Sequence, residues 1–221
     1  MTSTSDRPVV RGRRQTLSEA RLAVNETGLE AQPAQFSIGM WAVILFVSSE
    51  TMFFGALFTT YFYLKARLAN WEPVLEQCVA DCHKPGWEGL PLVNTIILVA
   101  SSFTMQFAVW SIQRGDRVWL RNWLAVTVVM GVVFLAGQGY EYSVLGFLPD
   151  NGIFAAVFFT LTGFHGAHVL GGVLFNSLVL FRAWKGHFSA RRHLAVEAAS
   201  IYWHFVDVVW IGLFTTIYII S

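Results

Sequence analysis

Charged residues and cysteines are both scarce in this chain. Only 13% of its 221 residues are charged, against roughly 25% in an ordinary soluble domain, which argues against a water-soluble globular protein. Two cysteines are too few for a disulfide-rich scaffold. A formal net charge of +1 gives no reason to expect nucleic acid or acidic substrates as partners. Apolar residues make up 55% of the chain, so we expect lipid to be its solvent.

Five long apolar stretches follow a polar segment over residues 1–35. Each has about 20 residues or more, the length that a helix needs to cross a bilayer core about 30 Å thick. Continuous apolar runs of this length fit helices and not the alternating strands of a barrel. The sequence therefore predicts an all-α fold, an integral membrane bundle of five transmembrane helices within residues 36–221. We place the spans at 38–64, 92–113, 122–142, 152–182 and 196–220.

Basic residues lie mainly on one side of the predicted membrane. The polar segment has five arginines, the connection 114–121 has three and the connection 182–195 has four basic residues, whereas the connection 65–91 on the other side has three. Because Lys and Arg beside spans stay in the cytoplasm, this predicts a cytoplasmic N-terminus and a C-terminus outside. We expect the polar segment to be a cytoplasmic tail and not a cleaved signal peptide, since no apolar run follows its arginines until about residue 38.

Ionisable side chains inside the predicted spans are functional candidates, because the bilayer disfavours charge. Glu50 lies about 18 Å along the first span. It is either a carboxyl that exchanges protons or contacts a partner, or a protonated acid hydrogen-bonded inside the bundle. Gln138 and Glu141 share a helix face at the end of the third span. There we expect a solvated helix end or a helix-to-helix hydrogen bond.

Histidines mark the last two spans. His165 and His168 fall on one face of the fourth span among small residues, which predicts close helix packing with the imidazoles as interhelical hydrogen-bonders. His204 pairs at helical spacing with Asp207 in the fifth span. A haem or copper centre usually needs more ligands than these histidines supply, which favours packing. Metal coordination and a proton relay stay as alternatives. The glycines of the packing motif are Gly163, Gly166, Gly171 and Gly172.

Five sequence blocks occur in the order known from one family of membrane proteins. They are SETMFF at 49–54, PLVNT at 91–95, QGYEY at 138–142, TGFHGAH at 162–168 and YWHFVDVVW at 202–210. By these blocks, spread over roughly residues 38–220, the chain resembles subunit III of the haem-copper oxidases, the cytochrome c oxidase subunit 3 family. It resembles the five-helix bacterial form, because mitochondrial members have seven helices and this chain begins where their third would.

The resemblance implies a subunit of a proton-translocating cytochrome c oxidase in the bacterial plasma membrane. The chain is then expected to have no catalytic centre, metal site, haem or copper of its own, and the haem and copper lie in partner subunits. Oxidase subunit I is the expected direct partner, with subunit II and other members in the same complex. The expected role is to stabilise the catalytic subunit and to support proton uptake, binding of structural phospholipids and oxygen access during aerobic electron transport.

The resemblance also assigns roles to individual residues. Glu50 matches the family's carbodiimide-reactive glutamate. Arg182 and His193 are expected contacts of phospholipid head groups, for which pairing of a cation with phosphate supplies the chemistry. The other polar residues of the spans are expected in helix packing and a polar network, namely Asn94, Gln138, Glu141, His165, His168, His204 and Asp207.

Cys78 and Cys82 have a spacing that resembles the start of the dinuclear copper motif in an oxidase's second subunit. The match ends there, because Gly86 and Gly89 stand where that motif has histidine and methionine. A disulfide or two free thiols is therefore expected, although the adjacent His83 leaves a surface metal site open.

Two other functions stay open. Subunit III of a quinol oxidase and the accessory protein of a nitric oxide reductase share the five-helix form, and the site of the electron donor belongs to other subunits. A proton-coupled transporter that uses Glu50 with His204 and Asp207 is a more distant alternative. The sequence shows no internal repeat of the kind that many transporters have.

Overall fold

The computed structural model describes residues 38–68, 88–190 and 192–220. The polar tail lies outside the described residues, and so do Cys78, Cys82 and His83. In the described part, five helices are long and apolar enough to cross a membrane, so the predicted all-α membrane bundle of five spans is confirmed. They are α2 (Ile38–Arg67), α4 (Leu90–Gln113), α5 (Arg117–Val144), α6 (Ile153–Trp184) and α7 (Leu194–Phe214), the last continued by the π-helical turn η1 (Thr215–Ile219).

α5 extends beyond its apolar run because the chain supplies a cap at its start. α5 begins at Arg117 and not near residue 122, because the Asp116 carboxylate accepts hydrogen bonds from the backbone N–H groups of Val118 and Trp119, both at 3.1 Å. These amides have no partner within the helix. Gly115, which follows α4, has a φ of 82°, a left-handed conformation that glycine adopts without strain. Capping, and not hydropathy, sets the boundary between these two helices.

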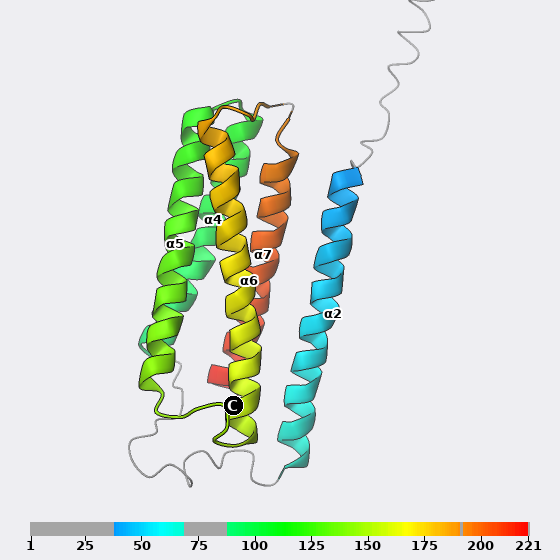
Figure 1. Ribbon diagram of the computed structural model, residues 1–221, viewed down its shortest axis with the longest axis vertical. Coiled ribbons are helices and arrows are strands. Elements are labelled where there is room, and N and C mark those ends of the chain that lie inside the picture. Colours follow the sequence, from blue (N-terminus) through cyan, green and yellow to red (C-terminus); the bar gives the residue numbers. More distant parts are fainter. Residues whose placement is uncertain (1–37, 69–87, 191, 221) are drawn as a thin grey trace, which may run out of the picture. The chain divides into compact units, whose positions relative to one another are not determined.

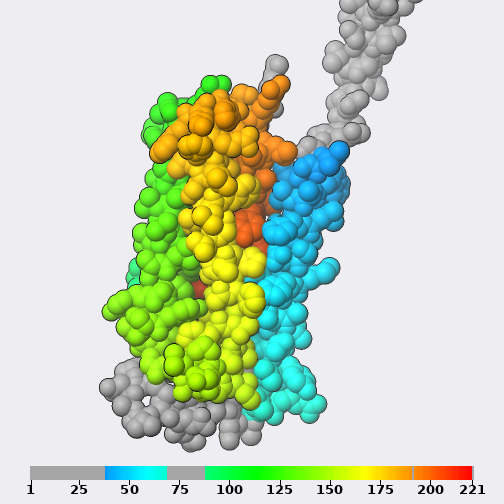
Figure 2. All heavy atoms as spheres, viewed as in Figure 1, coloured from blue at the N-terminus to red at the C-terminus, as the bar shows by residue number. Residues whose placement is uncertain are grey.

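Four of the helices form a closed bundle. α4 packs against α5, α5 against α6, α6 against α7, and α7 against α4 (Figure 1). α2 runs along α6 and α7 (Figures 1 and 2) and has only three buried residues, Met40, Phe54 and Tyr61. Among the described helices, α2 therefore has the fewest residues packed against the rest of the described chain.

Trp203 on α7 shows how the four helices of the bundle fit together. Its ring is fully buried between Gly172 of α6 and Gly131 of α5, and a Cβ atom on either glycine would lie 2.8 Å from a carbon of the ring. Its indole N–H donates to Ser101 Oγ of α4 at 2.9 Å. The two glycines thus form a slot for this ring, because any side chain there would occupy the space of the indole.

The packing predicted for the small residues of the fourth span is found at only some of them. Gly172 lies against Trp203, and a Cβ on Gly171 would lie 3.4 Å from the hydroxyl of Tyr202. Gly163 and Gly166 do not follow the prediction, since no other described segment comes within 4 Å of a Cβ placed on either. Helical spacing alone does not show which face of a helix meets a neighbour.

Candidate functional site

Glu50 of α2 and His168 of α6 form a polar contact between these two helices. His168 Nε2 lies 3.0 Å from Glu50 Oε2, and its Nδ1 lies 2.7 Å from the carbonyl oxygen of Phe164. Because a carbonyl oxygen only accepts, Nδ1 has a proton. Nε2 then either accepts a hydrogen bond from the protonated carboxyl of Glu50 or, when the imidazole is itself protonated, donates a hydrogen bond to the Glu50 carboxylate. In both forms the contact contains one proton and the pair has no net charge.

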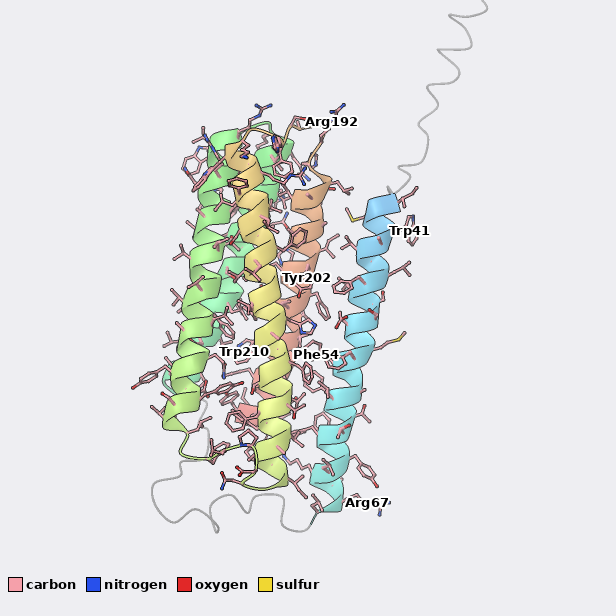
Figure 3. All side chains as sticks on the ribbon, in the orientation of Figure 1. Trp41, Phe54, Arg67, Arg192, Tyr202 and Trp210 are labelled. Atoms are coloured by element: carbon pink, nitrogen blue, oxygen red, sulfur yellow. The ribbon has the colours of Figure 1, made fainter. Side chains whose placement is uncertain are left out.

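Aromatic side chains surround this pair. The rings of Phe53 and Phe54 lie 6.4 and 5.0 Å from the imidazole, centroid to centroid, and the Tyr202 hydroxyl donates to His168 O at 3.0 Å. Figure 3 shows Phe54 directed from α2 toward the bundle. The side chains of Glu50 and His168 are 22% and 16% exposed, so the pair reaches the surface of the bundle. The two roles that the sequence predicts for Glu50, a carboxyl that exchanges protons or contacts a partner and a protonated acid hydrogen-bonded inside the bundle, both stay predictions.

Ser102 of α4 joins two side chains of α7. Its hydroxyl donates to Asp207 Oδ2, and His204 Nδ1 lies 3.0 Å from the same hydroxyl oxygen. A hydroxyl has one proton, so Ser102 accepts from His204 while it donates to Asp207. The sequence pairs His204 with Asp207 at helical spacing, and in the structure Ser102 of another helix bridges the two side chains. A serine inside an apolar span was the signal available, because a polar group in lipid needs a polar partner.

Glu141 belongs to a third polar cluster, at the C-terminal end of α5. Tyr218 of η1 donates its hydroxyl to Glu141 Oε1 at 2.7 Å, and Tyr142 donates to Thr162 Oγ1 of α6 at 2.8 Å. Glu141 and Gln138 are each 4% exposed. The structure thus gives Glu141 a hydrogen bond between helices and not a solvated position. Sequence reasoning missed Tyr218, which lies in an apolar run with no motif around it.

His165 lies inside the bundle and does not share the contacts of His168. Its ring stacks on Trp210 at 4.9 Å and meets Phe134 edge-on at 6.0 Å. Neither ring nitrogen of His165 has a hydrogen-bond partner among the described residues. The expected hydrogen bond between helices is therefore found at His168 and not at His165. Three residues along a helix rotate a side chain by about 60° from the first, enough to reach different neighbours.

Asn94 lies where α4 approaches α5. It is 2% exposed, and a Cβ atom on Gly137 would overlap its side-chain amide. The next residue, Thr95, accepts a hydrogen bond at its hydroxyl from the indole N–H of Trp210 at 3.0 Å. The start of α4 therefore packs against both α5 and α7.

The two residues expected to contact lipid head groups lie at the connection from α6 to α7. The Arg182 guanidinium lies 5.4 Å from the centre of the Phe188 ring. His193 Nε2 lies 3.0 Å from Glu197 Oε1, and its Nδ1 lies 3.3 Å from Ser189 O. Their role in lipid binding stays a prediction, and one ring nitrogen of His193 already has the Glu197 carboxylate as its partner.

These observations define a class of protein, a multi-pass helical membrane protein whose polar side chains mainly connect one helix to another. Met52, Phe103 and Val208 are 77%, 62% and 67% exposed, as expected for side chains that face lipid. In the described ranges, no three His, Cys, Asp or Glu side chains come together as a metal ion would require.

Comparison with known proteins identifies the family. The family model described as "Cytochrome c oxidase subunit III" matches residues 20–221. The chain is 43% identical over 183 residues to "Cytochrome c oxidase subunit 3" of Synechocystis sp., covering 82% of this chain and 75% of that one. It is 42% identical over 198 residues to the protein of the same name from Corynebacterium diphtheriae (86% and 90% covered) and 40% over 180 residues to that of Thermostichus vulcanus (81% and 86%). The chain belongs to the cytochrome c oxidase subunit III family.

Proposed function

We propose that this chain is the non-catalytic subunit III of a bacterial cytochrome c oxidase. In this proposal it lies in the plasma membrane, contacts the catalytic subunit I directly, and shares a complex with subunit II. It stabilises subunit I and supports proton uptake, lipid binding and oxygen access during aerobic electron transport. The observation that carries the proposal is the family match, which runs through all five spans, together with relatives of that name at 40 to 43% identity.

The arrangement of polar side chains supports placing the haem and copper in partner subunits. A haem iron or copper ion takes several His, Cys, Met or similar ligands. In the described residues, His168 instead contacts Glu50, and His204 contacts Ser102. The third histidine of the spans, His165, lies between aromatic rings. We therefore assign these side chains to packing and to hydrogen bonds between helices.

The orientation in the membrane is part of the proposal. Basic residues are concentrated at the end of the bundle where α4 joins α5 and α6 joins α7, which includes Arg192, whereas Arg67 lies at the opposite end (Figure 3). Since basic residues stay on the cytoplasmic side, we place the Arg192 end and the N-terminus in the cytoplasm.

Purification with a tag on this chain tests the proposed function. We expect the chain to bring down a haem-containing catalytic subunit in mild detergent, identified by mass spectrometry and by its optical spectrum. That complex should consume oxygen with reduced cytochrome c as donor, and an unrelated tagged membrane protein from the same cells is the control. Isolation of the chain without any haem protein would contradict the proposal. Stoichiometric haem or copper on the separated chain would contradict its cofactor-free role.

The substrates that the purified complex uses distinguish a cytochrome c oxidase from the two related complexes. Turnover with a quinol but not with cytochrome c would reassign the chain to a quinol oxidase. Nitric oxide reduction by the purified complex, without oxygen reduction, would make it an accessory protein of a nitric oxide reductase.

Glu50→Gln tests the role of the pair with His168 in the assembled complex. The glutamine amide donates a hydrogen bond to Nε2 of a neutral imidazole, so the contact between α2 and α6 is retained. We expect normal assembly, oxygen reduction that is largely kept, and a modest change in proton uptake or in the lifetime of turnover. Glu50→Ala, which removes the partner of His168, is the comparison. Complete loss of oxygen reduction in an assembled Glu50→Gln complex would show that Glu50 has a more direct part in the reaction.

A further inference from the structure

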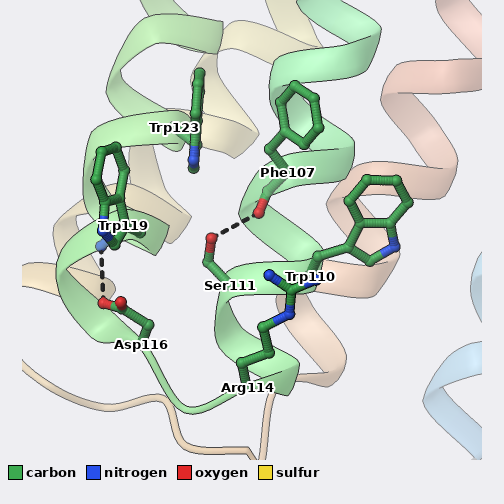
Figure 4. Close-up of a pocket in the computed structure, with 7 residues that line it drawn as sticks. All are labelled: Phe107, Trp110, Ser111, Arg114, Asp116, Trp119 and Trp123. Atoms are coloured by element: carbon green, nitrogen blue, oxygen red, sulfur yellow. Dashed lines mark hydrogen bonds between the residues drawn. The ribbon is translucent and has the colours of Figure 1, made fainter.

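A pocket of about 290 Å³ opens where α4 turns into α5 (Figure 4). This volume is just below that of known ligand sites, roughly 300–1,000 Å³, and suits a head group better than a whole lipid. Neither the family resemblance nor the proposed function assigns a role to its lining. The lining residues are Phe107, Trp110, Ser111 and Arg114 from the end of α4, with Asp116, Trp119 and Trp123 from the start of α5.

Aromatic rings form one wall of the pocket. Trp119 stacks on Trp123 at 6.0 Å, and the ring of Phe107 lies 5.1 Å from Trp123 and 5.6 Å from Trp110. Trp110 and Trp119 are 45% and 54% exposed. Tryptophan in this kind of position lies at the level of the lipid head groups, where its apolar ring and polar N–H are both accommodated. The wall therefore is an apolar surface of the kind that proteins place beside lipid head groups.

Arg114 is the one basic residue in the lining of this pocket. Its guanidinium has no hydrogen-bond or ion-pair partner among the described residues. Asp116, the acid in the lining, accepts hydrogen bonds from two backbone N–H groups at the start of α5, where the helix dipole favours a negative charge. Its carboxylate is thus held by the helix, and the Arg114 cation is left for a ligand.

The surrounding end of the bundle is basic. Anionic lipids in the cytoplasmic leaflet are attracted to such clusters next to membrane spans. The described basic residues at this end are Arg114, Arg117, Arg121, Arg182, Lys185 and Arg192, and the acids are Asp116 and Glu197.

We propose that this pocket binds the phosphate of an anionic phospholipid. Arg114 pairs with the phosphate oxygens, for which its planar guanidinium presents two parallel donors, and Trp119 and Trp123 cover the glycerol and the first part of an acyl chain. The aromatic wall favours a lipid over free phosphate, because a phosphate ion has no apolar part to cover. The inference rests on the lipid-binding part of the proposed function but not on the partnership with subunit I.

The test measures lipid binding to the delipidated, purified complex by native mass spectrometry. Phosphatidylglycerol is added back, with phosphatidylcholine and inorganic phosphate as comparison ligands. We expect Arg114→Gln to weaken binding of one phosphatidylglycerol about tenfold or more, the factor that loss of a charge-assisted hydrogen bond brings. Arg117→Gln is the matched control, since it removes the same charge three residues away, outside the lining. If the chain purifies without partner subunits, the proposed oxidase partnership fails. The lipid titration is then made on the full-length chain alone, so that lipid binding at the pocket is still tested.

A second variant tests the aromatic wall. Trp119→Ala should also weaken phosphatidylglycerol binding, because it removes an exposed ring that covers the lipid. Equal effects of Arg114→Gln and Arg117→Gln would mean that surface charge alone attracts the lipid, and the proposal would fall. Displacement of the lipid by inorganic phosphate at similar concentration would overturn it in favour of a soluble ligand. Loss of a subunit in Arg114→Gln with unchanged lipid binding would overturn it in favour of a protein partner.

Discussion

Replacing Gly172 with alanine adds a methyl group where the bundle has very little room. The new Cβ would lie 2.8 Å from Cε3 and Cζ3 of Trp203, well inside the separation of about 3.5–4.0 Å at which carbon atoms attract each other. The ring is fully buried and already has neighbours on two further sides. Its other edge faces Gly131, and its N–H is bonded to Ser101 at 2.9 Å. Helices α6 and α7 must therefore separate to admit the methyl group.

The expected magnitude follows from comparing two substitutions on α6. An added methyl group in a packed core destabilises by about 1–3 kcal/mol, while alanine in place of glycine favours a helix by up to about 1 kcal/mol. Gly166→Ala is the matched control, because no other described segment lies within 4 Å of its Cβ position. Both variants gain helix propensity, and only Gly172→Ala meets the ring. We expect Gly172→Ala to be less stable than Gly166→Ala by about 1–3 kcal/mol.

The assay is reversible unfolding of the purified protein in mixed micelles, with the free energy of unfolding taken from a detergent titration. Trp203→Phe in the Gly172→Ala background should recover part of the loss, because a smaller ring leaves space in the slot. That coupling between two residues in contact separates overlap from an unrelated loss of stability. Equal stability of Gly172→Ala and Gly166→Ala, within about 0.5 kcal/mol, would refute the slot formed by the two glycines.

Two further predictions concern polar contacts between helices and use the same unfolding assay. Ser102→Ala removes the donor to the buried Asp207 carboxyl and should lower the free energy of unfolding by about 1–3 kcal/mol, whereas Ser48→Ala, whose hydroxyl bonds a carbonyl of its own helix, should be nearly neutral. Equal effects of the two serine variants would argue against the bridge. Tyr218→Phe keeps the ring and removes only the hydrogen bond to the buried Glu141, and should destabilise by about 1–3 kcal/mol. A stability equal to that of the unaltered protein would contradict the role of this bond.

Hydropathy was sufficient to predict the five spans, because a bilayer requires about 20 apolar residues in each helix. It was less accurate at helix ends, where the cap at Asp116 extends α5 to Arg117. The ordered sequence blocks were sufficient for the family, since comparison with known proteins reaches the same result. The search for ionisable residues within the spans also selected Glu50 and His204, which lie in polar contacts between helices.

The amino-acid sequence by itself determined that this is a helical membrane protein of one family, because span length and motif order are local properties that need no partner. Only the tertiary structure decided which polar groups meet. The tertiary structure brought Ser102 into contact with His204, which is 102 positions later in the chain. It also placed His165 against Trp210. The physical reason is that a helix apolar on all sides can rotate about its axis without changing its hydropathy. Its orientation is settled only when its neighbours pack against it.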